Sequence, residues 1–297
     1  MKKALTYGIL ASAFFSFTFV LNKSMNISGG NWMWSASLRY IFMLPILLLI
    51  ILKNNRLNAV IKSIKRNPKY WIIWSTVGFG LFYAPLTFAS NYGESWLVAG
   101  CWQITIVAGI LLTPLFNSKL PLKNLFLSIF ILLGVFLIQY EHAKNINITQ
   151  ALLSIIPILI AAFSYPLGNR KMMILCKDDL STTERVFGMT FCSLPFWIIL
   201  SFVAYRNVGM PSFNQMFQAF SVAIFSGVIA TILFFKATNM VKHNFNQLAV
   251  IEATQSAEVL FTIIGEVIIL SGSIPSINGL IGLSFIIIGM ILNSIIS

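Results

Sequence analysis

Three glutamates, Glu252, Glu258 and Glu266, share one apolar segment near the C-terminus with Gln255 and Thr262. At about 100° per residue of α-helix, these five side chains fall within a stripe about 120° wide. A charged carboxylate that faces lipid is costly, so the stripe predicts a helix face turned toward protein or toward a water-filled cavity. A carboxyl group in such a place can bind a proton or a cation.

Depth along the helix separates the three carboxylates. With a rise of about 1.5 Å per residue, Glu252 lies roughly 9 Å from the start of the segment, Glu258 roughly 18 Å and Glu266 roughly 30 Å. Glu258 is therefore the first candidate for the coupling-ion site and Glu252 the second, because low-dielectric surroundings favour the neutral, proton-carrying form. The alternatives are a structural hydrogen bond for Glu258, an ion pair of Glu252 with Lys236 or Lys242, and helix-end packing for Glu266.

Neutral polar and aromatic side chains of other apolar segments complete the candidate substrate cavity. With Gln255 and Thr262, they are Asn22, Phe82, Tyr83, Trp102, Gln103, Tyr165 and Asn169. Aromatic faces suit flat apolar or cationic ligands, although each ring also fits ordinary helix packing. Arg39 is the one cation that we place inside a segment. We expect a structural charge there, paired with Glu94, or a contact to a carboxylate on the substrate.

Ten long apolar segments must hold these residues. They cover residues 4–22, 32–52, 71–90, 95–116, 123–140, 149–169, 184–204, 216–236, 247–270 and 277–296. About 20 apolar residues cross the roughly 30 Å of bilayer hydrocarbon, and a backbone in lipid has to satisfy its own hydrogen bonds as a helix. Only 9% of the chain is charged and 58% is hydrophobic, whereas soluble domains carry about 25% charged residues. The composition predicts an all-α integral membrane protein with ten transmembrane helices.

The basic residues are sorted by side of the membrane. All but four of the 20 Lys and Arg lie on one set of alternating loops and helix ends; the exceptions are Lys23, Arg39, Lys144 and Arg206. Positive charge collects on the cytoplasmic side, so we expect both termini inside the cell and the protein in the plasma (inner) membrane. The net charge of +12 then reflects topology and anionic lipid. No zinc spacing or RNA-binding pattern supports a nucleic-acid partner.

The chain also resembles itself at an offset of about half its length. The matches are Phe15-Ser16 with Phe163-Ser164, Asn22-Lys23 with Asn169-Arg170, Arg39 with Arg185, and Gln103 with Gln255. Two halves, 1–145 and 146–297, would each contain five helices. Because five is odd, the second half must enter the bilayer from the opposite face. This predicts a 5+5 inverted repeat, an arrangement common among secondary transporters.

Short motifs agree with one known family. Leu38-Arg39-Tyr40 resembles the "LRF" segment of the drug/metabolite transporter superfamily, and Gly265-Glu266 followed by Gly279–Gly282 resembles its C-terminal motif. The segment Phe163–Arg170 resembles the multidrug resistance efflux transporter branch. The resemblance implies export or exchange of small organic molecules through a cavity between the first, third, fourth, sixth, eighth and ninth helices. The four-helix small multidrug resistance relatives carry an essential glutamate in their first helix, whereas the first and sixth predicted spans of this chain contain no acidic residue.

These patterns predict a secondary transporter that exports drugs or cationic and aromatic metabolites by alternating access, with protons as the candidate coupling ion. The alternative is an amino-acid or nucleobase-type exporter or facilitator without proton coupling. The sequence has no phosphate-binding GxxxxGK[ST] loop and no GxSxG elbow or in-span histidine, so we expect neither ATP use nor enzyme activity. We expect no metal and no cofactor, and we keep a homodimer as one candidate assembly. The substrate and the direction of transport stay open.

Overall fold

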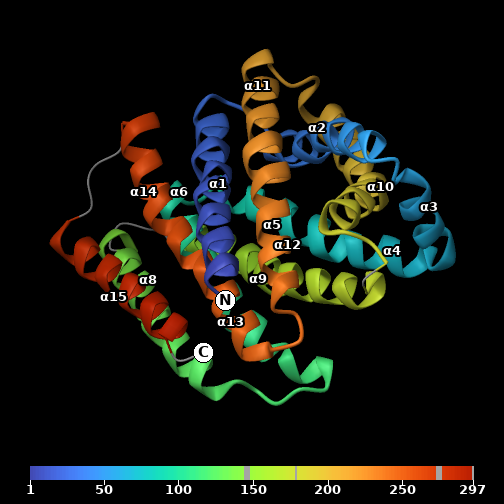
Figure 1. Cartoon of the computed structure of the whole chain (residues 1–297). Helices are drawn as coiled ribbons and strands as arrows, with labels where there is room; N and C mark the ends of the chain where they lie inside the picture. The colour runs from blue at the N-terminus through green and yellow to red at the C-terminus, as the bar shows by residue number, and fades with distance from the viewer. Residues whose placement is uncertain (144–147, 178, 272–275, 296–297) are drawn as a thin grey trace.

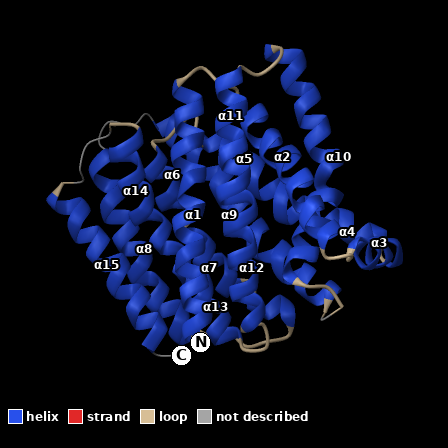
Figure 2. Cartoon of the chain, turned by 45° about the horizontal axis from the view of Figure 1, so that its top comes forward, coloured by secondary structure: helices blue, strands red, loops and turns tan. Residues whose placement is uncertain are grey.

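The computed structural model describes residues 1–143, 148–177, 179–271 and 276–295, and within these ranges the chain folds as helices without a strand (Figures 1 and 2). The elements are α1 (Lys2–Ile27), α2 (Trp32–Lys53), α3 (Leu57–Arg66), α4 (Pro68–Ser75), η1 (Thr76–Gly80), α5 (Leu81–Ala89), α6 (Ser95–Trp102), α7 (Ile104–Leu111), η2 (Thr113–Phe116), α8 (Leu122–Ala143), α9 (Ile148–Cys176), α10 (Thr182–Val208), α11 (Phe213–Val222), η3 (Ala223–Ala230), α12 (Thr231–Met240), α13 (Phe245–Ala253), η4 (Thr254–Ser256), α14 (Ala257–Ile269) and α15 (Ile277–Ile295).

Seven helical segments of the described chain are long and apolar enough to cross a membrane. They are Lys2–Ile27, Trp32–Lys53, Pro68–Ala89, Leu152–Cys176, Thr182–Val208, Phe213–Met240 and Phe245–Ile269. Three shorter apolar helices, Ser95–Leu111, Leu122–Gly134 and Ile277–Gly289, follow the remaining predicted spans. The prediction of an all-helical membrane protein is confirmed at this level. Membrane crossing by all ten segments stays a prediction, and the predicted boundary between the halves lies outside the described residues.

One helix lies outside the predicted spans. α3 carries Lys62, Lys65 and Arg66 on an exposed face and buries only Val60, so it is amphipathic, as expected for a helix at a membrane surface. Figure 1 shows α3 beside α4 at the edge of the bundle.

Four of the long segments are interrupted at corresponding places. η1 and η3 are π-helical turns inside the third and eighth predicted spans. The fourth predicted span changes helix at Gln103, between α6 and α7, and the ninth contains the 3₁₀ turn Thr254–Ser256. The prediction of one regular helix over 247–270 is therefore wrong in detail, since α13 and α14 meet at this turn. The five polar residues of the stripe are nevertheless all buried.

Helices from the two ends of the chain pack in pairs. α2 lies against α10, α8 against α15, α5 against α9, and α1 against α12 and α14. The α8–α15 pair stands at one side of the bundle in both Figure 1 and Figure 2. The start of α1 and the end of α15 lie near each other at the same end of the bundle. The core therefore forms between the halves of the chain rather than within each half.

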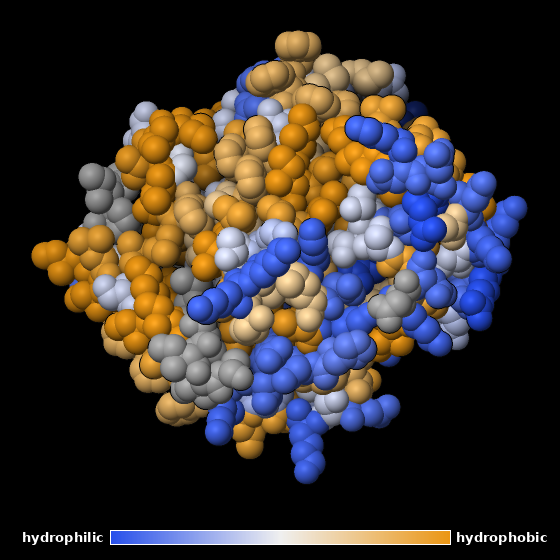
Figure 3. Space-filling view, in the orientation of Figure 1, coloured by the Kyte–Doolittle hydropathy of each residue, from blue (hydrophilic) through white to orange (hydrophobic). Residues whose placement is uncertain are grey.

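Two glycines allow a close crossing of α9 with η1 in the core. A Cβ atom on Gly168 of α9 would stand 2.3 Å from the Cα atom of Gly78 in η1, so the two helix backbones touch here. The outer surface is apolar, with Ile198, Ile199 and Phe202 of α10 at least 60% exposed. Figure 3 shows hydrophobic surface over most of one face, with hydrophilic residues gathered toward its right and lower parts. Lipid is the solvent that suits such a surface.

Candidate functional site

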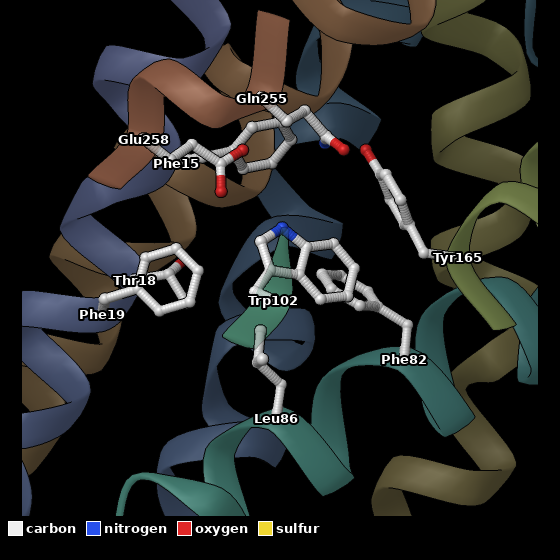
Figure 4. Close-up of a pocket in the computed structure, with 9 residues that line it drawn as sticks. All are labelled: Phe15, Thr18, Phe19, Phe82, Leu86, Trp102, Tyr165, Gln255 and Glu258. Atoms are coloured by element: carbon white, nitrogen blue, oxygen red, sulfur yellow. The ribbon is translucent and has the colours of Figure 1, made fainter. Parts of the chain in front are cut away.

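A small cavity lies in the middle of the bundle (Figure 4). Its walls come from α1, α5, α6, α9, η4 and α14, and the lining residues are Phe15, Thr18, Phe19, Phe82, Leu86, Trp102, Tyr165, Gln255 and Glu258. The space measures about 10 Å³, close to the least that holds one water molecule. All nine lining residues are buried, so the cavity is closed around its polar groups.

Glu258 is the charged residue of this cavity. Its side chain is 1% exposed, and neither carboxylate oxygen has a hydrogen-bond partner of normal geometry. The indole nitrogen of Trp102 points toward the carboxylate (Figure 4) and is the side-chain donor that interacts with it. Arg39 acts on this carboxylate electrostatically but forms no ion pair with it, and a buried carboxyl group without an ion pair is costly in its charged form. Such a group is suited to binding a proton or a cationic ligand.

Aromatic rings form the opposite wall. The ring centroids of Phe82 and Tyr165 are 4.6 Å apart, those of Phe82 and Trp102 5.0 Å, and those of Trp102 and Tyr165 5.7 Å. The Tyr165 hydroxyl is buried without a hydrogen-bond partner, and Figure 4 shows it directed toward the Gln255 amide. The rings and the carboxylate together provide the two kinds of contact that an organic cation takes.

Arg39 lies near this cavity in a different setting from the one predicted. Its guanidinium carbon stands 4.0 Å from the centre of the Tyr83 ring, and its Nη1 donates to the Thr18 hydroxyl over 3.2 Å. The predicted pairing with Glu94 is wrong, because Glu94 pairs with Lys23 over 3.1 Å. The rings of Tyr40 and Tyr83 lie against the buried Arg39 guanidinium, and Arg39 contacts the cavity-lining residue Thr18.

Glu252 belongs to a buried ion pair. Arg170 of α9 donates through Nε to Oε1 over 3.1 Å and through Nη2 to Oε2 over 2.7 Å. The predicted partners Lys236 and Lys242 are therefore wrong. A Cβ atom on Gly109 of α7 would stand 2.2 Å from Oε2. A side chain at position 109 would therefore displace the end of the Glu252 side chain from its place against Arg170.

Glu266 is bound at the opposite end of the same segment. Its Oε2 accepts hydrogen bonds from the Ser95 hydroxyl over 2.5 Å and from the Trp96 backbone N–H over 3.2 Å. These bonds attach α14 to the first turn of α6. The geometry fits the helix-end packing role that the sequence suggested for this residue.

The remaining candidates are buried but lie outside the central cavity. Asn22 donates to the Tyr83 hydroxyl over 3.2 Å, and the Gln103 amide donates to the Ala99 carbonyl over 3.0 Å. Thr262 has no hydrogen-bond partner for its hydroxyl. Asn169 lines a narrower gap together with Glu252, Tyr165 and Gln255, next to the central cavity.

Sequence reasoning missed two groups of residues. Phe15, Thr18, Phe19 and Leu86 line the cavity, although nothing distinguishes them from ordinary core residues of α1 and α5. Arg170 and Arg185 are 1% and 3% exposed, so Arg39 is not the only cation inside the bundle. The match of Arg39 with Arg185 in the internal repeat was the signal that could have identified Arg185 as a buried cation.

This arrangement of apolar helices around an enclosed, acidic and aromatic cavity defines a multi-pass membrane protein of the transporter type. Residues 2–297 match the family model EmrE, described as "Putative multidrug resistance efflux transporter". The chain belongs to this family, within the drug/metabolite transporter superfamily. The resemblance noted in its motifs is thereby confirmed.

Relatives extend the match over the whole chain. The "Uncharacterized protein YjlA" of Bacillus subtilis (strain 168) is 49% identical, covering 99% of this chain and 95% of its own. An "Uncharacterized 42.1 kDa protein" of Shouchella clausii is 48% identical over 87% of this chain and 70% of its own length. A crystal structure, described only as that of a protein, superposes with a TM-score of 0.73 at 13% identity. It covers 100% of this chain and 98% of its own, and shows a shared fold.

Proposed function

We propose that this chain is a secondary transporter that exports small organic molecules, drugs or cationic and aromatic metabolites, across the plasma membrane by alternating access. The observation that carries the proposal is the carboxyl group of Glu258, which is buried in a cavity of aromatic rings, faces the Trp102 indole and forms no ion pair with any described residue. A transporter of this kind binds proton and cation at the same group in turn, so that each drives the release of the other. The proposal makes the protein a carrier rather than an enzyme.

The contacts between helices support an inverted repeat of residues 1–145 and 146–297. In such a repeat α1 corresponds to α9, α5 to α12 and α7 to α14. The α1–α12 contact then has its counterpart in the α5–α9 contact, and the α1–α14 contact in the α7–α9 contact. The α2–α10 and α8–α15 contacts each map onto themselves. Both halves contain a π-helical turn, at η1 and η3. Two similar halves that face opposite ways are what alternating access requires.

The ninth span supports a mechanism with two closures. Glu252 attaches its α13 end to α9 through Arg170, and Glu266 attaches its α14 end to α6 through Ser95. Glu258 lies between these two attachments. We infer that opening to either side breaks one attachment and keeps the other, and that the 3₁₀ turn Thr254–Ser256 allows the two ends to move separately. With the predicted topology, the Arg170 end faces the cytoplasm.

A proteoliposome assay tests the proposal. Purified protein, Glu258→Gln and the control Glu94→Gln, whose carboxylate is 54% exposed, would be reconstituted with a pH-sensitive dye inside. They would then be offered cationic dyes and amino acids with and without a pH gradient. We expect substrate-dependent proton movement in the wild type and in Glu94→Gln, and none in Glu258→Gln. Substrate flux that changes neither with the pH gradient nor with Glu258→Gln would refute proton coupling at this site.

One observation favours the second candidate, an amino-acid or nucleobase-type facilitator without proton coupling. Arg39 contacts the cavity through Thr18, and its Nε has no hydrogen-bond partner. A buried guanidinium of this kind can bind a carboxylate on a substrate. The same assay distinguishes the two, because the facilitator would move amino acids without a pH change and would lose that activity in Arg39→Gln but not in Glu258→Gln.

A further inference from the structure

A second cavity lies at the end of the bundle where α1 begins, away from Glu258. It measures about 330 Å³, within the range of small-molecule sites and far larger than the central cavity. Its walls come from η2, from the end of α9, from the loop that leads into α13 and from α13 itself. The lining residues are Phe116, Arg170, Met173, Ile174, Lys177, Lys242, His243, Phe245 and Leu248.

The polar part of this pocket is basic. Arg170, Lys177 and Lys242 supply three cationic groups and His243 adds an imidazole, and none of the lining residues that the structure describes is a carboxylate. The charge of Arg170 is balanced by Glu252 behind it. Its Nη1 makes only a 3.5 Å contact with Thr113 and can still donate to a ligand. Lys171 adds further positive charge beside the pocket, with Nζ 5.0 Å from the centre of the Phe116 ring.

The other part of the pocket is apolar and aromatic. Phe116 and Phe245 each lie 5.8 Å from the Arg170 guanidinium carbon, and Met173, Ile174 and Leu248 complete the wall. The N-terminus of α13 is not the anion-binding element, because the Asn244 side chain already accepts from the N–H groups of Asn246 and Gln247. Side chains therefore set the chemistry of the site.

We propose that this pocket binds an organic anion. Its phosphate, sulfonate or carboxylate group lies against Arg170 and Lys177, and its apolar part lies against Phe116 and Phe245. Such a ligand is opposite in charge to the cation expected at Glu258 under the proposed function, and the two cavities share no lining residue. The ligand can come from two sources, the headgroup of an anionic lipid or a soluble aromatic anion, which share this chemistry.

Native mass spectrometry of the full chain in detergent tests the proposal without a transport assay. One arm titrates phosphatidylglycerol against phosphatidylcholine with the same acyl chains, and the other titrates phenyl phosphate. Each is measured on the wild type, on Lys177→Ala/Lys242→Ala, and on the control Lys62→Ala/Lys65→Ala in the exposed helix α3. The control removes the same charge from the same protein outside the pocket.

We expect binding in at least one arm to weaken about tenfold, or about 1.4 kcal/mol, in the pocket variant only. If only phosphatidylglycerol binding weakens, the ligand is a lipid headgroup. If only phenyl phosphate binding weakens, the ligand is a soluble anion. Absence of binding in both arms, or equal loss in the pocket and α3 variants, would overturn the proposal. A single Lys177→Glu variant with an unchanged melting temperature replaces the double variant if the latter does not fold, and the same tenfold loss is expected of it.

Discussion

Arg170 and Glu252 form a two-point ion pair in the interior, with donor–acceptor distances of 3.1 and 2.7 Å and exposures of 1% and 4%. The pair joins α9 to α13 close to the wall of the basic pocket. On the same segment, Glu258 has no such partner. Two carboxylates six positions apart therefore have opposite surroundings, one neutralised by a cation and one left for a ligand or proton.

Removal of one member of the buried pair should be strongly destabilising. Glu252→Gln leaves the Arg170 charge buried without compensation, which costs about 3–5 kcal/mol. Glu94→Gln is the control, because Glu94 is 54% exposed in its pair with Lys23 and such surface pairs contribute about 0.2–1 kcal/mol. Unfolding in detergent, followed by tryptophan fluorescence, measures both. Equal losses from the two substitutions would contradict this account of the pair.

Gly109→Ala should destabilise the protein through the same carboxylate. The added methyl group would stand 2.2 Å from Glu252 Oε2, and overpacking of this kind costs about 1–3 kcal/mol. In a Glu252→Ala background the obstructing atom is absent, so the penalty of Gly109→Ala should fall by at least half. A double-mutant cycle on the free energy of unfolding measures this coupling. Additive losses would show that the two residues do not touch.

The crossing of α9 with the third span should not tolerate a larger residue. In Gly168→Ala the new atom would stand 2.3 Å from the Gly78 backbone, which cannot move as a side chain does. In the control Gly265→Ala the nearest atom is a Val20 methyl group at 3.0 Å. We expect Gly168→Ala to lose at least about 3 kcal/mol or to fail to fold, and Gly265→Ala to lose under about 1 kcal/mol. Thermal melts that rank the two in the reverse order would contradict the close crossing.

Neutral substitutions of two glutamates should have opposite effects on stability. Glu258→Gln removes a buried carboxylate that forms no ion pair with any described residue, and the glutamine oxygen can still accept from the Trp102 indole, so stability should stay equal or rise. Glu266→Gln weakens hydrogen bonds from Ser95 and Trp96 and should cost about 1.5–3 kcal/mol, as for hydrogen bonds to a charged group. Melting temperatures in one detergent compare them directly. A lower melting temperature for Glu258→Gln than for Glu266→Gln would mean that Glu258 has a structural role.

Cysteine labelling tests the predicted orientation. Lys62 of α3 and Asn207 near the end of α10 are both exposed, and the positive-inside rule places them on opposite sides. In a background with the native cysteines replaced by alanine, a membrane-impermeant maleimide added to intact cells should label Asn207→Cys and not Lys62→Cys. Both should react once the membrane is permeabilised. The reverse pattern would invert the topology and place the basic pocket outside the cell.

The sequence alone was sufficient to predict an all-helical membrane protein and the positions of most of its helices. Apolar runs of span length between basic loops leave a chain few alternatives to membrane helices, because lipid requires each backbone to satisfy itself. The acidic stripe also followed from local periodicity, since Glu258 and Gln255 face the interior in spite of the 3₁₀ turn between α13 and α14.

Pairing across the bundle was decided by the tertiary structure. Glu252 had nearby lysines as candidate partners, yet it binds Arg170, and Glu94 binds Lys23 rather than Arg39. Helix periodicity shows which face of a helix is polar, but it does not show which neighbour meets that face or at what height. Those facts depend on close contacts between distant segments, such as Gly78 with Gly168 and Gly109 with Glu252. The residues that close the cavity are therefore fixed by packing, whereas the residue that gives it charge could be found from the sequence.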